Sequence, residues 1–180
     1  MVRTARNPRP LDGAALEELA LRYVARFATT RAKLESYLAR KLRERGWDGE
    51  GEPDTQGLSG KLVSAGYIDD AAYARARTDG LLRRGYGLRR VGQALAAAGV
   101  ERELQVAAAP GEAEQRRAAT ALARKRGFGP FGSDGPDRAR REKQIAAMLR
   151  AGHRMEHVLR VIDTGDARDL EDWIVEEGSE

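Results

Sequence analysis

The only two histidines of this 180-residue chain form a pattern known from zinc enzymes. The segment from His153 to His157 matches H-x-x-E-H, which places two imidazoles on one helix face as zinc ligands. A catalytic zinc needs a third ligand, which Asp163 could supply. Gly152, however, lies just before the motif, at a predicted break between two helices. We therefore favour two solvated imidazoles at a turn and helix start, and predict neither a metal nor a cofactor.

A second pattern is rich in glycine and resembles a nucleotide-binding loop. Residues 127–132 match G-x-G-x-x-G, but a dinucleotide fingerprint needs a strand before it and a helix opening within it. Residues 118–126 are predicted to be helical instead, and Pro130 interrupts the loop. We interpret the segment as a linker that Phe128 and Phe131 attach to the core.

The adjacent carboxylates Asp69 and Asp70 could be read as an acid–base pair. Neighbouring residues at a helix start do not converge on one substrate atom, whereas capping of that helix explains both acids. No serine has a histidine partner in a recognisable motif, and cysteine is absent. The sequence therefore predicts no catalytic residues and a protein that is not an enzyme.

Basic residues remain as the candidates for binding. The chain has 32 Lys and Arg against 28 acidic residues, yet residues 1–162 carry a net charge of +11 and residues 163–180 one of −7. Arginine offers a planar fork of donors that suits phosphate and carboxylate, so a polyanionic partner is one interpretation and solvated helix faces are the other. The candidate contact residues are Arg83, Arg84, Arg89, Arg90, Arg116, Arg117, Lys125, Arg126, Arg140 and Arg141.

Aromatic residues make up only 6% of the chain. We interpret Tyr67, Tyr73 and Tyr86 as core or hinge packing rather than as platforms for bases. The charge pattern therefore favours contact with phosphates or an acidic surface over the recognition of base sequence.

The elements that must position these residues are predicted to be helices. Alanine and leucine greatly outnumber the β-branched residues, which argues against sandwiches, barrels and parallel sheets. Gly46, Gly99 and Gly152 follow amphipathic segments at intervals of 53 residues, as glycines that end helices do. Further helices are expected over residues 12–27, 58–65, 70–84, 101–109, 112–126, 155–162 and 168–177.

The repeat predicts an elongated, all-α tandem array of three three-helix, helix-turn-helix-like modules. A unit of about 50 residues buries too little surface to be stable alone, so neighbouring units should share a core. The acidic tail either folds back on the basic body or docks as a helix through Leu170, Trp173 and Ile174. The expected parts are a basic, flexible N-terminus (1–11), the modules 12–66, 67–110 and 111–163, and the acidic tail (164–180).

No apolar run approaches the roughly 18 residues of a membrane helix, and the N-terminus lacks the apolar centre of a signal peptide. We expect a cytoplasmic monomer.

In their order and spacing, the repeated residues resemble the RecX family. The segment from Leu62 to Ala74 is similar to that family's L-x-x-x-G-[YF]-[IL]-[DN]-D-x-x-[FY]-A. Two departures are the long loops at 47–57 and 127–136, and a third is Ala94, where a glutamate is common. The motif residues are Gly46, Gly66, Tyr67, Asp69, Asp70, Gly87, Gly99 and Gly152.

The resemblance implies three tandem three-helix modules without enzymatic activity. It further implies binding to RecA and to its filament on single-stranded DNA, with filament growth, strand exchange, ATP hydrolysis and co-protease activity limited as a result. Double-stranded DNA is a further candidate partner. The resemblance supplies no contact residues, so the choice of the basic residues above rests on charge alone. The alternative is a helix-turn-helix-type DNA-binding regulator that acts without RecA.

Overall fold

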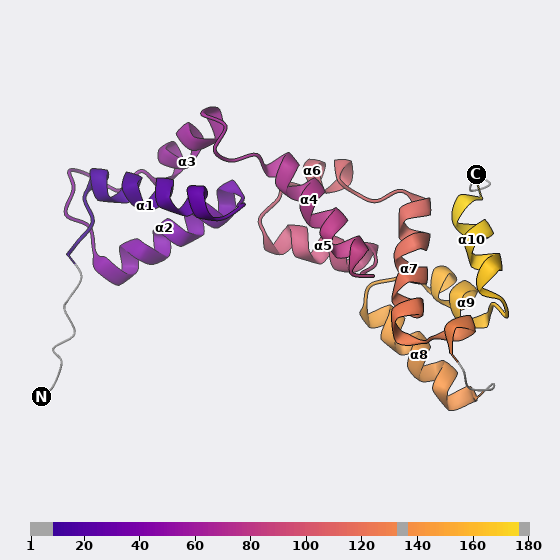
Figure 1. The fold of residues 1–180 in the computed structure, drawn as a ribbon. Coiled ribbons are helices and arrows are strands. Elements are labelled where there is room, and N and C mark those ends of the chain that lie inside the picture. The colour runs from indigo at the N-terminus through magenta and orange to yellow at the C-terminus, as the bar shows by residue number, and fades with distance from the viewer. Residues whose placement is uncertain (1–8, 133–136, 177–180) are drawn as a thin grey trace, which may run out of the picture. The chain divides into compact units, whose positions relative to one another are not determined.

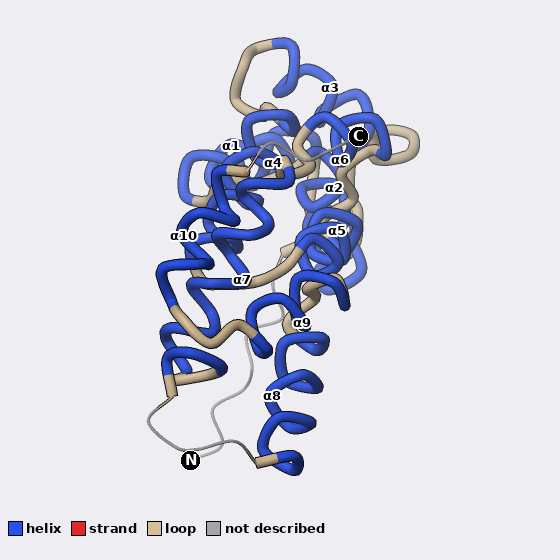
Figure 2. The backbone as a smooth tube through the Cα atoms, turned by 90° about the vertical axis from the view of Figure 1, so that its right-hand side faces the viewer, coloured by secondary structure: helices blue, strands red, loops and turns tan. Residues whose placement is uncertain are grey.

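The computed structural model describes residues 9–132 and 137–176, and these form ten α-helices and one short 3-10 helix, with no strand of a sheet among them (Figures 1 and 2). The predicted all-α fold is confirmed. None of these helices is both long and apolar enough for a membrane crossing. The elements are α1 (Gly13–Arg26), α2 (Arg31–Arg45), α3 (Thr55–Ser64), α4 (Asp70–Arg83), α5 (Leu88–Ala97), α6 (Arg102–Ala107), α7 (Glu112–Arg126), η1 (Gly129–Phe131), α8 (Arg138–Arg150), α9 (Met155–Asp163) and α10 (Ala167–Val175).

The chain divides into two compact units, and the boundary between them falls within α4. Unit 1 comprises Met1–Tyr73 with Ala98–Val100, and unit 2 comprises Ala74–Ala97 with Glu101–Glu180. The module limits at residues 66 and 110 stay a prediction.

The core of unit 1 lies between α1, α2 and α3 and includes the fully buried Leu34 and Leu38. Leu11 is also fully buried in this core, and its backbone is held in place: its N–H donates to the Gly46 carbonyl at 3.0 Å and its carbonyl accepts from Asp48 N at 2.8 Å. The prediction of a flexible terminus is therefore wrong for Leu11, while residues 1–8 lie outside the described ones. Tyr67 is 60% exposed because Ile68 takes the neighbouring place in the core, so core packing was the wrong interpretation for this tyrosine.

The core of unit 2 joins α7, α8, α9 and α10 around buried apolar side chains such as Met148 and Val161. Leu170 and Trp173 of α10 belong to this core, so the acidic segment has the docked-helix form of the two alternatives. Phe128 and Phe131 pack against the same core, which confirms their predicted role in attaching the glycine-rich linker.

The three repeated glycines end α2, α5 and α8 with φ of 83°, 69° and 96°, as the sequence predicted. The turn after each of these helices accepts a hydrogen bond from another segment of the same unit. Leu11 binds the Gly46 carbonyl, the Thr30 hydroxyl donates to the Ala98 carbonyl, and Arg89 N donates to the Gly152 carbonyl at 3.1 Å. The repeat therefore marks a docking turn as well as a helix end.

Candidate binding surface

Four of the ten predicted contact residues are exposed and unpaired. Arg83 ends α4, Arg90 lies in the first turn of α5, and Arg117 and Lys125 lie on α7. Their side chains make no hydrogen bond, ion pair or aromatic contact with any residue that the structure describes. Because these cations are not neutralised by the protein itself, they are available to an anionic partner.

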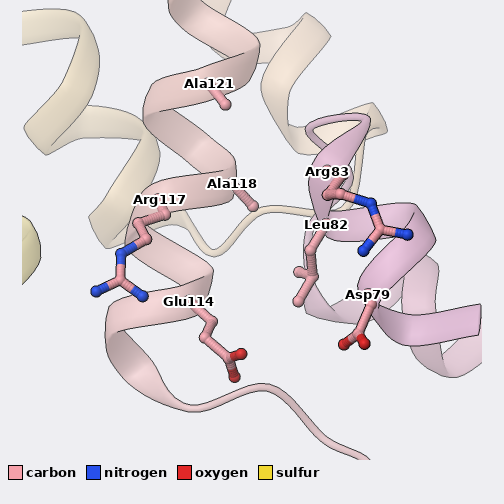
Figure 3. Close-up of a pocket in the computed structure, with 7 residues that line it drawn as sticks. All are labelled: Asp79, Leu82, Arg83, Glu114, Arg117, Ala118 and Ala121. Atoms are coloured by element: carbon pink, nitrogen blue, oxygen red, sulfur yellow. The ribbon is translucent and has the colours of Figure 1, made fainter. Parts of the chain in front are cut away.

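Arg83 and Arg117 border one pocket of about 420 Å³ between α4 and α7. Figure 3 shows Arg83 and Arg117 on its two sides, with Leu82 and Ala118 between them and the carboxylates of Asp79 and Glu114 below. Asp79 is exposed, and Glu114 caps α7 by accepting from Gly111 N at 2.9 Å.

This pocket suits a protein surface better than a phosphate backbone. A run of phosphates would meet the carboxylates of Asp79 and Glu114 as well as the two guanidinium groups, and the like charges would repel. A protein segment can offer an acid to each arginine, a base to each carboxylate and an apolar side chain to Leu82. The α4–α7 pocket is therefore a candidate protein-binding site.

The side chains of four other candidates form hydrogen bonds or ion pairs within unit 2. Arg84 Nε donates to the Gly80 carbonyl at 2.9 Å, and Arg89 Nη2 donates to the Leu149 carbonyl at 2.6 Å. Arg116 is corrected from contact residue to internal brace, because its side chain is only 12% exposed and donates to the carbonyls of Trp173 and Glu176. The fourth is Arg141.

Arg141 forms a two-bond ion pair with Asp163 at 2.6 Å for each bond. Hydrogen bonds from Arg141 hold the pKa of Asp163 below its ordinary value. Arg140 and Arg141 line a second pocket of about 570 Å³ beside η1. The last candidate, Arg126, has its guanidinium 6.0 Å from the centre of the Phe128 ring.

The two histidines of the H-x-x-E-H pattern bind different partners, and both are buried, so the interpretation as solvated imidazoles is wrong. His153 Nε2 lies 2.9 Å from the Gly85 carbonyl oxygen, and burial lowers the pKa of this histidine. His157 Nε2 lies 2.6 Å from Glu112 Oε1 instead, and Glu156 completes a group of three ligand-type side chains within 4.8 Å.

Glu112 in this group is already paired with cations. Its carboxylate also meets Arg116 Nε at 3.3 Å and Arg154 Nη1 at 3.5 Å. Burial alone would raise the pKa of Glu112, but the hydrogen bonds from His157 and Arg116 bring it below its ordinary value. The cluster is thus an ion-pair network that joins α7 to α9.

Two groups of residues were missed in the sequence. Asp79, Leu82 and Glu114 became visible only when α4 and α7 were placed together, although Asp79 and Arg83 at i and i+4 share a helix face. The second group is aromatic and lies in unit 1, where Tyr23, Phe27 and Tyr37 contact one another. The spacing of Tyr23 and Phe27 by four residues was an available signal for one of these contacts.

The described residues define a class of all-α proteins that carry exposed cations on their helices. The family model for the second three-helix domain of RecX matches residues 69–108. The regulatory protein RecX of Myxococcus xanthus (strain DK1622) is 33% identical over 174 residues, covering 92% of this chain and 93% of that protein. The regulatory protein RecX of Agrobacterium fabrum is 33% identical over 147 residues, covering 78% of this chain and 79% of the relative.

A solved structure agrees with the fold. The crystal structure of RecX from Lactobacillus salivarius superposes with a TM-score of 0.67 at 19% identity, covering 88% of this chain and 96% of that one. The chain belongs to the RecX family of regulatory proteins. The resemblance deduced from the motif residues is confirmed.

Proposed function

We propose that this protein binds RecA and RecA filaments on single-stranded DNA, and that it restrains RecA recombinase, ATPase and co-protease activity during DNA repair and the SOS response in the cytoplasm. Membership of the RecX family supports the regulatory role. The observation that supports filament binding is that four predicted contact residues of unit 2 are exposed and make no pair among the described residues: Arg83, Arg90, Arg117 and Lys125.

The two kinds of partner surface in a nucleoprotein filament match two kinds of site. The mixed-charge α4–α7 pocket meets the protein, where acidic and apolar side chains can pair with Arg83, Arg117 and Leu82. Arg90 and Lys125, which do not line this pocket, meet phosphates. Several weak contacts on one chain add through effective concentration.

The test measures ATP hydrolysis by preformed RecA filaments on single-stranded DNA as the protein is titrated. We expect inhibition at ratios well below one protein per RecA subunit, because a contact within a filament affects its neighbours. No inhibition up to equal ratios would refute the proposal. Tight binding to a particular duplex sequence together with no effect on RecA would favour the helix-turn-helix regulator.

A pair of double variants locates the effect. Arg83→Ala with Arg117→Ala should raise the concentration for half-inhibition by roughly tenfold or more, because each substitution removes an ion pair or charged hydrogen bond to the partner protein. Arg160→Ala with Arg168→Ala is the control, because it removes two exposed, unpaired arginines of the same unit from α9 and α10. Equal losses in the two double variants would show that net charge, not the pocket, matters.

A further inference from the structure

Unit 1 carries a row of three aromatic rings on α1 and α2. The rings of Tyr23 and Tyr37 are stacked, with centroids 4.3 Å apart and planes at 18°. Phe27 follows Tyr23 by one helical turn, at 5.4 Å and with a tilt of 51°. At the C-terminal end of α1, the tilted ring of Phe27 therefore lies next to the stacked pair of Tyr37 and Tyr23.

Cations lie over both ends of this row. The guanidinium carbon of Arg26 is 5.4 Å from the Phe27 centroid, and that of Arg40 is 5.5 Å from the Tyr37 centroid. Lys41 Nζ is 6.0 Å from the same Tyr37 ring. Arg40 and Lys41 both bind the single carboxylate of Glu44, so the three cations exceed the acidic charge paired with them.

The three rings differ in how far they are buried. Tyr23 and Tyr37 are partly buried and pack against the core of unit 1, which fixes their orientation. Phe27 is 49% exposed at the end of α1 and does not belong to that core. Core packing therefore explains the two tyrosines but leaves the exposed face of Phe27 unexplained.

We propose that Tyr23, Phe27 and Tyr37, with Arg26, Arg40 and Lys41, form a binding site for unpaired bases of single-stranded nucleic acid. A base stacks on the half-exposed ring of Phe27 in place of the Arg26 guanidinium that now lies over it. The phosphates next to it pair with Arg26 and replace Glu44 as the partner of Arg40 and Lys41.

The combination of rings and cations favours this ligand over others. An acidic protein surface would satisfy the cations but would not require a half-exposed aromatic ring beside them. A duplex offers phosphates, yet its bases are stacked on one another and do not present a face to Phe27. The site does not rest on the proposed regulatory function, because it concerns unit 1 and requires no RecA.

The test compares binding of the full chain to two labelled oligonucleotides of equal length, about 12 residues, followed by fluorescence anisotropy. One is oligothymidylate and the other has the same phosphates with abasic sugars. We expect oligothymidylate to bind at least roughly tenfold more tightly. Phe27→Leu, which keeps an apolar side chain but removes the ring, should abolish most of this difference and leave affinity for the abasic strand unchanged.

Two further variants keep the result interpretable. Phe27→Trp should restore or strengthen the preference for bases, which a loss of folding would not allow. Tyr67→Leu is the matched control, because Tyr67 is another exposed aromatic residue of unit 1 outside the row. The proposal is overturned if the two strands bind equally, if neither binds, or if Phe27→Leu and Tyr67→Leu behave alike. The RecA assay reports separately, so either proposal can fail while the other stands.

Discussion

Gly152 is a residue at which an added methyl group should strongly destabilise the protein. Its φ of +96° lies where side chains are rarely tolerated, and a Cβ there would be 2.6 Å from Arg90 N and 3.2 Å from Arg90 Cα. These neighbours are main-chain atoms at the start of α5, so they cannot rotate away as the end of a long side chain could. Gly152→Ala must therefore strain its own backbone and separate α5 from the turn after α8.

The two effects add to a large fraction of a domain's stability. Positive φ costs a residue with a Cβ about 1–2 kcal/mol, and overpacking costs about 1–3 kcal/mol. The sum of about 2–5 kcal/mol compares with a total of about 5–15 kcal/mol for a typical protein. At a slope of about 2 kcal/mol per molar urea, the unfolding midpoint of unit 2 should fall by about 1–2.5 M.

The assay follows urea unfolding by Trp173 fluorescence in a Trp47→Phe background, because the chain has only two tryptophans and Trp173 lies in unit 2. Two controls separate the two effects. Gly127 has φ of +64° with only ordinary contacts, so Gly127→Ala should cost the backbone part of about 1–2 kcal/mol. Gly92 lies in α5 with open space around it, so Gly92→Ala should stabilise by about 0.5–1 kcal/mol.

The expected order of midpoints is thus Gly92→Ala, wild type, Gly127→Ala and Gly152→Ala, from highest to lowest. If Gly152→Ala lowers the midpoint no more than Gly127→Ala does, the close approach of α5 to the turn contributes nothing and the argument from contact distance is refuted.

Three other perturbations test unit 2. Burial lowers the pKa of His153 below its ordinary 6.5, so the imidazole takes up a proton more readily in the unfolded chain, and stability should fall as the pH drops below about 6.5. His153→Gln should flatten this pH dependence when urea unfolding is measured at a series of pH values. An unchanged dependence of stability on pH would contradict the prediction. Leu170→Ala should lower stability by about 2–5 kcal/mol in thermal unfolding, because Leu170 is fully buried; a loss below about 1 kcal/mol would mean that α10 is not part of the core. Arg116→Ala should cost about 1–3 kcal/mol of stability, because its hydrogen bonds to carbonyls at the end of α10 are lost. Arg117→Ala should weaken filament inhibition with little change in stability. If Arg117→Ala destabilises the protein and Arg116→Ala does not, the structural role given to Arg116 and the binding role given to Arg117 are refuted.

Helices and their ends followed from the sequence because the signals are local. Glu112–Arg126 was predicted to the residue, since Pro110 and Gly111 precede it and Gly127 follows it. Asp69 caps α4 as predicted by accepting from Ala72 N at 2.8 Å. Asp70 differs, because it accepts from Arg31 N of α2 at 2.9 Å, a contact that depends on tertiary packing.

Long-range contacts could not be predicted, because the signals in the sequence are local. Leu11 looks like part of a polar, arginine-rich terminus until its carbonyl and N–H pair with the segment around Gly46. The stack of Tyr23 on Tyr37 joins two helices, and no spacing within either helix predicts it. Charge alone likewise placed Arg116 on the surface, whereas its guanidinium lies 5.2 Å from the Trp173 ring.

The arginine pairs show why a count of charges overstates a binding surface. Adjacent residues on a helix point about 100° apart, so a pair rarely faces one partner. Arg84, Arg89 and Arg116 bind carbonyls of their own unit, whereas their neighbours Arg83, Arg90 and Arg117 are unpaired among the described residues. In each of these three pairs one arginine braces the fold and one is available. Of the three available arginines only Arg90 lies outside the α4–α7 pocket. With about 0.7 counterions released per phosphate on single strands, these three pairs would contribute about 0.7 to the salt dependence of DNA binding, where six phosphate contacts would suggest about 4.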